Sequence, residues 1–407
     1  MNMARPAPRV HGDVSCWYHY DPMLSDAGLL LPAIPAVIAV ASFATLVRVY
    51  ATTRRLADVP PSPEGQGPRV SIVVAARDEE RHIRGAVAAL LSQDYHDVEL
   101  IVVEDRSKDR TGAILDAMAA KTNRLAVVHI RELPAGWLGK NYALHTGSQR
   151  ATGELILFAD GDVMLHRSAV SRAVRVFDDP GADHVAVAPQ MDLPSWPVQL
   201  VVGYFLTWGM LLSRVWRVEN PKSSAALGVG AFNMVRTVNY RAVGGHTHIA
   251  MRPDDDLMLG KILKEAGGQP RVLFGQGMVG VEWYRSLREA TQGFRKNAFA
   301  VLRYNVLLFA VATLANLALS VYPFVAVFIT DGPERVLYGI AVAALLACYA
   351  RTAAAQHLPL WLTLLYPVAA ILQTGMLVIA VLRTLIAGGI EWRGTFYPLD
   401  QLKANRV

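Results

Sequence analysis

Residues 154–162 read ELILFADGD, an apolar run that ends in two aspartates separated by one glycine. A short apolar run bounded by turn residues is typical of a buried β-strand. Asp160 and Asp162 would then lie beyond its carboxyl end, where ligands of parallel sheets bind. Two carboxylates in that position can hold a divalent cation, Mg²⁺ or Mn²⁺, against phosphate groups. The alternative is a simple strand-end turn, in which Asp and Gly are common.

On both sides of this segment, from Arg69 to about Leu287, strand-like runs alternate with helical patterns. The runs are VSIVVAA (70–76), VELIVVED (98–105), LAVVHI (125–130) and HVAVAPQ (184–190), and one helical segment is HIRGAVAALLSQ (82–93). Such alternation predicts an α/β fold, with a mostly parallel sheet and helices on both faces.

Further polar residues follow the predicted strands. Asp105 ends the second strand and can accept hydrogen bonds from a base or a ribose hydroxyl, although a helix cap also explains this segment. In the segment VAARDEE, we assign Ala75, Arg77 and Glu79 to ligand binding; a surface ion-pair cluster at a helix start is the alternative. Lys140 follows a glycine and can neutralise phosphate, unless it is an ordinary solvated lysine.

A third acidic cluster, Asp254-Asp255-Asp256, comes just before the helical pattern LMLGKILKEAG. Aspartate is favoured at a helix N-terminus by the free N–H groups and the helix dipole. Three aspartates in succession exceed what capping requires. We therefore expect at least one of them to act as a general base on an acceptor hydroxyl.

The composition indicates that part of the chain lies in lipid, because 53% of its 407 residues are hydrophobic and only 18% are charged. The net charge of +6 suits a membrane surface or a phosphate-bearing substrate, and no basic run indicates a nucleic-acid partner. Cys16 and Cys348 are too few for a disulfide framework or a zinc site.

Residues 28–47 carry no charge and are long enough to cross a bilayer as a helix. The following arginines, Arg48, Arg54 and Arg55, place the downstream domain in the cytosol by the positive-inside rule. Three more apolar blocks follow, at 306–330, 336–350 and 358–387, of which the middle one is short. Three crossings that start in the cytosol would place the C-terminal tail outside, but the basic residues of the tail favour the cytosol. Either the last block contains a re-entrant turn near Pro367, or one block lies in the interface.

These features divide the chain into six parts. They are a non-cytosolic tail (1–27), a membrane helix (28–50), a linker (51–68), a catalytic domain (69–300), an apolar region of about three segments (301–387) and a tail (388–407).

In this order, VSIVVAARDEE, VELIVVEDRSKDRT, GWLGKNYAL, FADGD and PDDDLMLG resemble the motifs of the family-2 glycosyltransferases, over about residues 69–305. The resemblance implies a GT-A-type nucleotide-diphospho-sugar transferase domain, inverting chemistry and a UDP-sugar or GDP-sugar donor. It implies that Asp105 contacts the base or ribose, and that Asp160 and Asp162 bind metal and diphosphate. Asp256 would be the general base, and Asp255 the acidic residue that usually precedes it.

Within that family, GWLGKNYAL, YRSLREATQGFRKNAF and IEWRGTFYPL look most like membrane enzymes of carotenoid and hopanoid pathways, and are similar to the ceramide glucosyltransferase group. One motif departs from the pattern Gln-x-x-Arg-Trp, because Gln292-Gly293-Phe294-Arg295 is followed by Lys296. The departure argues against polysaccharide synthesis. It leaves Arg295 either a diphosphate contact or part of an amphipathic interface helix.

The sequence thus predicts a metal-dependent hexosyltransferase of the plasma membrane, with a cytosolic catalytic domain, a nucleotide-sugar donor and a lipid acceptor. A polyprenyl phosphate or a growing polysaccharide is the alternative acceptor. The alternative from another class is a membrane transport or scaffold protein, which the scarcity of charges inside the apolar blocks disfavours.

Overall fold

The structure is a computed structural model that describes residues 22–297 and 299–404, with the side chains of 22–28 and 295–297 excepted. Its centre is a seven-stranded sheet with the order β3-β2-β1-β4-β8-β6-β9, in which only β8 runs antiparallel to its neighbours. The strands are β1 Val70–Ala76, β2 Val98–Asp105, β3 Leu125–Ile130, β4 Leu155–Asp160, β6 Ala182–Ala188, β8 Asn233–Arg236 and β9 Gln269–Phe274. The predicted mostly parallel sheet is confirmed.

The register of this sheet brings the ends of three strands together. Ala75 of β1 lies opposite Asp160 of β4, and Ala76 lies opposite Glu104 of β2. The polar residues that follow these strands therefore emerge at one edge. Two smaller sheets add β5 Val163–Leu165, β7 Gln190–Asp192 and β10 Val279–Glu282 in one, and the hairpin of β11 Gly389–Trp392 and β12 Thr395–Pro398 in the other.

Helices cover both faces of the central sheet, because successive strand residues point to opposite sides. Leu157 of β4 packs in a buried cluster with residues of α2 and α5, whereas its neighbours Ile156 and Phe158 pack with residues of α4 and α8. The helices of this part are α2 Ile83–Leu91, α3 Thr111–Ala119, α4 Gly139–Arg150, α5 Ala169–Val176, α7 Thr237–Ala242 and α8 Asp255–Glu265. Short 3₁₀ helices are η1 Leu56–Asp58, η2 Val215–Arg217, η3 Gly245–Thr247 and η4 Leu360–Leu365.

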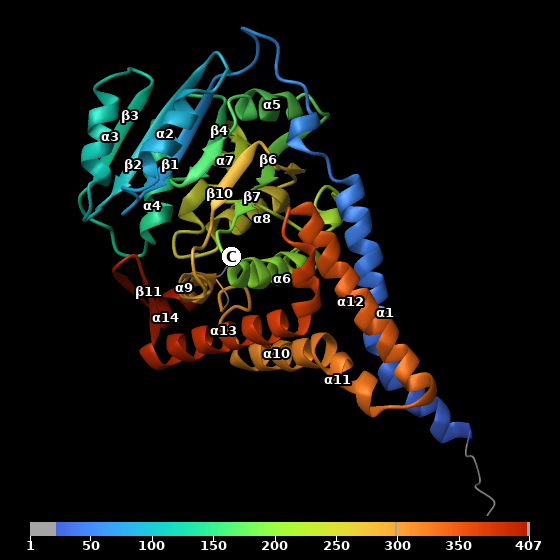
Figure 1. Ribbon diagram of the computed structural model, residues 1–407. Helices are drawn as coiled ribbons and strands as arrows, with labels where there is room; N and C mark the ends of the chain where they lie inside the picture. The colour runs from blue at the N-terminus through green and yellow to red at the C-terminus, as the bar shows by residue number, and fades with distance from the viewer. Residues whose placement is uncertain (1–21, 298, 405–407) are drawn as a thin grey trace, which may run out of the picture.

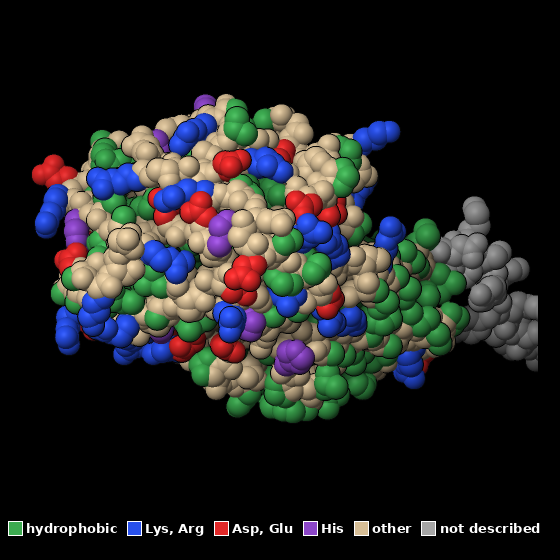
Figure 2. Space-filling model, turned by 90° about the horizontal axis from the view of Figure 1, so that it is seen from above, with side chains coloured by type: hydrophobic (Ala, Val, Ile, Leu, Met, Phe, Trp, Pro, Cys, Tyr) green, Lys and Arg blue, Asp and Glu red, His purple; other side chains and the backbone are tan. Residues whose placement is uncertain are grey.

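Apolar helices lie on one side of this α/β domain (Figure 1). They are α1 Pro22–Thr52, α6 Trp196–Leu212, α10 Val306–Ser320, α11 Tyr322–Ile329, α12 Gly332–Ala355 and α13 Tyr366–Ala387. Helix α9 Leu287–Asn297 packs between them and the domain, and α14 Leu399–Ala404 is the last helix described. In Figure 1, α1 and α12 run side by side as an extension, and α6, α10 and α13 lie below the sheet. Figure 2 shows mixed acidic and basic side chains on the domain, whereas hydrophobic side chains cover the extension.

Among the described residues, four helical segments are long and apolar enough to span a membrane, namely 29–52, 196–217, 332–355 and 360–387. The second, which contains α6, was not expected, because its apolar run lies inside the predicted catalytic domain. The middle C-terminal block was expected to be short, but α12 has 24 residues. Neither the re-entrant turn near Pro367 nor the alternative of an interfacial block is tested, because no membrane is present. Pro367 occupies the first turn of α13, where proline is tolerated, and α10 meets α11 at an angle of 43°.

Candidate active site

A cleft of about 1010 Å³ opens beyond the carboxyl ends of β1, β2 and β4. Nine of the predicted site residues line it: Ala75, Arg77, Glu79, Asp105, Lys140, Asp160, Asp162, Asp255 and Asp256. The tenth, Arg295, lies in α9, two residues after Gly293 of the cleft lining, but its side chain is outside the described part. The sheet edge therefore gathers residues that are up to about 180 positions apart in the sequence.

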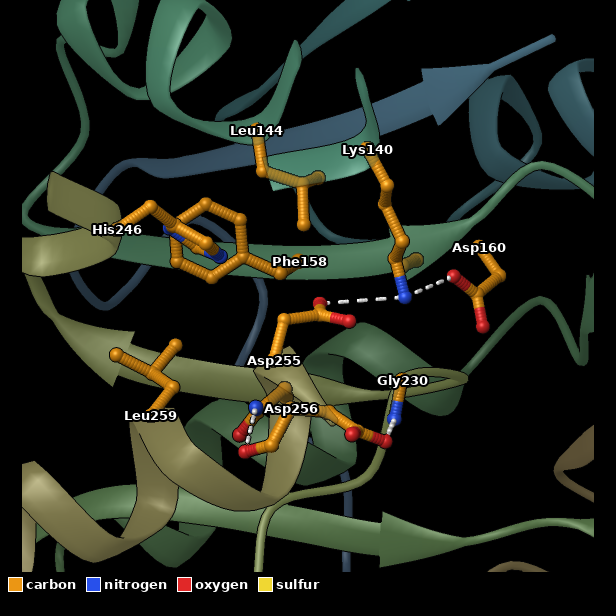
Figure 3. A pocket seen from close by; sticks show the side chains of 11 residues that line it. Lys140, Leu144, Phe158, Asp160, Gly230, His246, Asp255, Asp256 and Leu259 are labelled. Carbon is orange, nitrogen blue, oxygen red and sulfur yellow. Dashed lines mark hydrogen bonds and ion pairs between the residues drawn. The ribbon is translucent and has the colours of Figure 1, made fainter. Parts of the chain in front are cut away.

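Lys140, the second residue of α4, joins two of the predicted acidic residues. Its Nζ lies 2.8 Å from Oδ1 of Asp160 and 3.3 Å from Oδ2 of Asp255 (Figure 3). Burial lowers the pKa of Lys140, but the neighbouring carboxylates outweigh burial and raise this pKa overall. The ammonium group therefore stays charged, and it holds the end of β4 against the start of α8.

The three consecutive aspartates have three different partners. Asp254 pairs with Arg252 at 2.7 Å, and Asp255 pairs with Lys140. Asp256 accepts hydrogen bonds from the backbone N–H of Gly230, at 2.7 Å, and from that of Leu257, at 2.8 Å. Each carboxylate oxygen of Asp256 therefore keeps one lone pair for another donor. Of the three, Asp256 is the carboxylate that is oriented without being tied to a basic side chain.

Gly230 faces the centre of the site. A Cβ at this position would lie 2.7 Å from Oδ2 of Asp160 and 3.3 Å from Oδ2 of Asp256, so a larger residue would displace these carboxylates. Gly228 packs tightly against the start of α8, because a Cβ at this position would overlap the backbone oxygen of Asp256.

Asp162 lies in a negatively charged environment. Burial, together with the charges of Asp160 and Glu79, raises the pKa of Asp162 to about 7. Among the residues that the structure describes, no three His, Cys, Asp or Glu side chains are arranged to hold a metal ion alone. Mg²⁺ is commonly bound by one or two carboxylates together with substrate phosphates and water. Asp160 and Asp162 fit that partial ligand set.

Asp105 is buried and already paired. Its Oδ1 lies 2.7 Å from Nε of Arg106, and its Oδ2 lies 3.6 Å from Nη1 of Arg77. The carboxylate lines the cleft at the end of β2, as the sequence predicted, but two guanidinium groups share it. Its contact with a base or ribose stays a prediction.

The C-terminal hairpin β11–β12 also lines the cleft, although no site residue was predicted in it from the sequence. Arg393 Nη2 lies 2.6 Å from Oε1 of Glu79, and the Tyr397 hydroxyl accepts a hydrogen bond from Gly139 N at 3.2 Å. The pattern GIEW-RG-TFYP is compatible with a hairpin around a two-residue loop. Arg-Gly is a weak hairpin signal compared with Asn-Gly, and the pattern does not show which part of the molecule the hairpin meets.

Another side of the cleft is aromatic and adjoins the apolar helices. Trp283 and Tyr284 stack with their ring centroids 4.5 Å apart, and both line the cleft. Trp283 also contacts Phe205 of α6, at a centroid distance of 5.3 Å, and Phe294 of α9, at 6.1 Å. The cleft therefore extends from the charged strand ends to a region beside the candidate membrane helices.

Residues 71–198, which include Asp105, Lys140, Asp160 and Asp162, match the family described as Glycosyl transferase family 2. The chain carries a family-2 glycosyltransferase domain. Its mostly parallel sheet, with helices on both faces and the acidic residues at the strand ends, is the GT-A-type fold expected from the sequence.

Curated relatives of this glycosyltransferase domain are distant. The chain is similar to the 4,4'-diaponeurosporenoate glycosyltransferase of Staphylococcus haemolyticus, with 24% identity over 56% of this chain and 60% of that protein. It is also similar to the beta-monoglucosyldiacylglycerol synthase of Synechocystis, with 34% identity over 28% of this chain and 24% of that protein. The chain thus matches less than two thirds of either relative.

Among solved structures, the mannosyltransferase PcManGT of Pyrobaculum calidifontis, in complex with GDP-Man and Mn²⁺, aligns with 87% of this chain and 99% of its own. The identity is 20% and the TM-score is 0.48.

Proposed function

We propose that this protein is an inverting glycosyltransferase that moves a sugar from a UDP-sugar or GDP-sugar to a lipid or isoprenoid-type acceptor at the membrane. The observation that carries the proposal is the cleft itself. It joins the acidic strand ends of a family-2 domain to an aromatic side beside apolar helices. A soluble acceptor would not account for that second side.

In this proposal the reaction is a single displacement. The carboxylate of Asp256 takes the proton of the acceptor hydroxyl, whose oxygen attacks the anomeric carbon while the bond to the nucleoside diphosphate breaks. The configuration at that carbon is inverted. Gly230 N and Leu257 N orient the carboxylate, and a positioned base of this kind typically contributes about 10² to 10⁴ in rate.

Lys140 would act on the leaving group. Its charge lies between Asp160 and Asp255, where it can stabilise the negative charge that develops on the diphosphate. Asp160 and Asp162 would hold a divalent cation, Mg²⁺ or Mn²⁺, which supplies Lewis-acid stabilisation of the same charge when bound. Arg77, Glu79 and Asp105 would bind the nucleotide.

The acceptor would approach from the side of Trp283 and Tyr284. The rings of these residues and the neighbouring apolar helices offer a surface on which a hydrophobic chain can lie while its hydroxyl reaches Asp256. Two relatives support a lipid-type acceptor by their names, one of which contains diaponeurosporenoate and the other glucosyldiacylglycerol.

We place the catalytic domain on the cytosolic side of the plasma membrane, following the basic residues after α1. The ends of α1 and α12 lie together, because the Tyr50 hydroxyl is 3.5 Å from Thr352 Oγ1. These two helices would cross in the same direction, toward the domain. The bent pair α10 and α11 would lead away from it toward the start of α12, beginning at Tyr304, which is buried in a cluster with Leu138 of the domain, and α10 runs beside α13 (Figure 1).

With this arrangement α13 does not cross. It begins at Tyr366, whose ring lies 6.2 Å from that of Tyr349 near the end of α12, and it ends beside the hairpin that lines the cleft. Both ends lie on the side of the domain, so α13 would lie along the membrane surface (Figure 1). In this proposal the chain would leave the domain through α10 and α11 and return through α12, so that the C-terminal tail would lie in the cytosol, in agreement with its basic residues.

The test is transfer of radiolabelled sugar from a panel of UDP-sugars and GDP-sugars into organic-extractable lipid by membranes that contain the full chain. We expect one donor to label lipid and Asp256→Asn to lower the rate at least about 100-fold. The matched control is Glu265→Gln, which neutralises an exposed acid at the other end of the same helix.

Two outcomes would change the proposal. If no donor labels lipid in the presence of host lipids, the lipid-acceptor assignment fails. If lipid is labelled but Asp256→Asn retains most of the rate, a polyprenyl phosphate becomes the better acceptor, because a phosphate oxygen needs little help from a base.

A further inference from the structure

The C-terminal hairpin presents an arginine at its tip in an unfavourable backbone conformation. Arg393 and Gly394 form the two-residue loop between β11 and β12, with φ of 47° and 71°. Positive φ at both positions is the requirement of a type I′ turn, which is usually met by Asn or Gly. For an arginine, this conformation is sterically unfavourable. Such an outlier, when the surrounding structure holds it, is a reason to look for a functional contact.

The surrounding structure does hold the hairpin. Ile390 and Tyr397 are buried in one cluster with Leu138 and Tyr304. The Tyr397 hydroxyl accepts a hydrogen bond from Gly139 N, at the start of the helix that carries Lys140. The tip is therefore fixed relative to the strand ends.

The guanidinium group of Arg393 points into the cleft beside the nucleotide-sugar residues. It donates to the backbone oxygen of Arg77 and lies 2.6 Å from Oε1 of Glu79. Its side chain is 40% exposed, compared with 8% for Arg77 and 16% for Lys140. Of these three cations, Arg393 is the one whose position and exposure allow it to exchange a protein carboxylate for a ligand.

The acidic lining of the cleft favours such a cation. Its lining contains more than twice as many carboxylates as Lys and Arg side chains, and a nucleoside diphosphate is itself an anion. A guanidinium group binds phosphate oxygens with two parallel hydrogen bonds, which an ammonium group cannot do.

We propose that the hairpin Gly389–Pro398 forms the second wall of the donor site, and that Arg393 binds the diphosphate of the nucleotide-sugar. This inference rests on the proposed function. A diphosphate contact was considered above for the Gln292–Lys296 segment, which lacks the expected tryptophan. The present inference assigns this contact to Trp392-Arg393 of the tail. Strand β11 begins two residues after the end of α13. The proposed donor site is therefore directly connected, along the chain, to the helix proposed to lie on the membrane surface.

The experiment compares the binding of UDP, GDP, uridine and guanosine to the full-length protein in detergent with Mg²⁺ present, by calorimetry and by competition. For the diphosphate that binds, we expect Arg393→Ala to weaken affinity about 10-fold to 100-fold, as for the loss of hydrogen bonds between charged groups. The affinity for the corresponding nucleoside should not change. Arg393→Lys should fall between. Lys403→Ala, which removes a cation from the same tail outside the cleft lining, should match the wild type.

The outcomes separate the two proposals. If the wild type binds neither diphosphate, the proposed function fails and this inference fails with it. If the wild type binds a diphosphate and Arg393→Ala binds it equally well, or loses diphosphate and nucleoside to the same extent, only the role of Arg393 is overturned. Should Arg393→Ala not purify, Arg393→Lys decides, because it keeps the charge but not the bidentate geometry. Wild-type affinity in that variant would contradict the proposal.

Discussion

The two walls of the cleft are built in different ways. The first consists of residues at the ends of β1, β2 and β4, and the sheet register sets their relative positions, with Ala75 opposite Asp160. The second is the hairpin β11–β12, which reaches the cleft only after the chain has passed through all the apolar helices. The contact between Arg393 and Arg77 joins positions 316 residues apart.

The α/β domain and the apolar helices are therefore not separate modules, because both contribute to the lining of one cleft. The strand-end wall carries the carboxylates and Lys140, and all of these residues lie before the apolar helices α10 to α13 in the chain. The hairpin wall carries a cation and an anchoring tyrosine, and it depends on the end of α13. We therefore expect changes in the first wall to abolish turnover, and changes in the second wall to weaken donor binding.

The largest expected effect concerns Asp162. Asp162→Asn removes one of the two carboxylates proposed to hold the divalent cation, and should lower sugar transfer by about 10² to 10³, the usual cost of losing one electrostatic contact to the developing charge. Transfer by the wild type should also stop when the divalent cation is chelated and return when Mn²⁺ or Mg²⁺ is added back.

The control for this prediction is Asp97→Asn. It neutralises an acid beside Arg69, at the opposite end of the sheet, and should retain the wild-type rate. Full transfer by Asp162→Asn, or by chelated wild type, would contradict the assignment of this wall to metal and diphosphate binding.

The sequence was sufficient for the first wall for a physical reason. Buried strands have a strong apolar signature, and in a parallel sheet their carboxyl ends meet at one edge, so Asp160 and Asp105 could be placed together without a structure. The partners of these residues were not predictable in the same way. The ion pair of Lys140 with Asp255 depends on how α4 and α8 pack, which no local pattern encodes.

The second wall and α6 were missed for another reason. The apolar run of α6 is interpreted equally well as a buried helix of a soluble domain, since periodicity does not distinguish lipid from protein interior. The hairpin has a recognisable pattern of its own, but its position at the cleft is a tertiary contact. From the sequence, Arg393 was part of the motif IEWRGTFYPL and of the basic tail, and it was not assigned to the site.

An intermediate effect is expected at Gly230, between the acidic residues of the first wall. Gly230→Ala would place a Cβ 2.7 Å from Oδ2 of Asp160, so the carboxylates must shift. Misplacement of reacting groups by about 1 Å can cost about 10²-fold, and we expect a fall in kcat of about 10-fold to 100-fold. Gly209→Ala in α6 is the matched control, because nothing lies within 4 Å of its added Cβ. Equal kcat for the two variants would show that Gly230 does not shape the site.

The smallest expected effect tests the anchoring of the second wall. Tyr397→Phe removes the hydroxyl that accepts from Gly139 N, and the loss of one buried hydrogen bond costs about 1 kcal/mol. The matched comparison is Tyr95→Phe, whose hydroxyl donates to the backbone oxygen of Pro68 at 2.7 Å, away from the cleft lining. Both variants should lower the thermal midpoint slightly. Tyr397→Phe alone should also raise the KM for the donor a few-fold, because the position of Arg393 depends on the anchored hairpin. If both variants change only the thermal midpoint, the Tyr397 anchor does not affect donor binding. The role of the second wall in binding would then be limited to the contact made by Arg393.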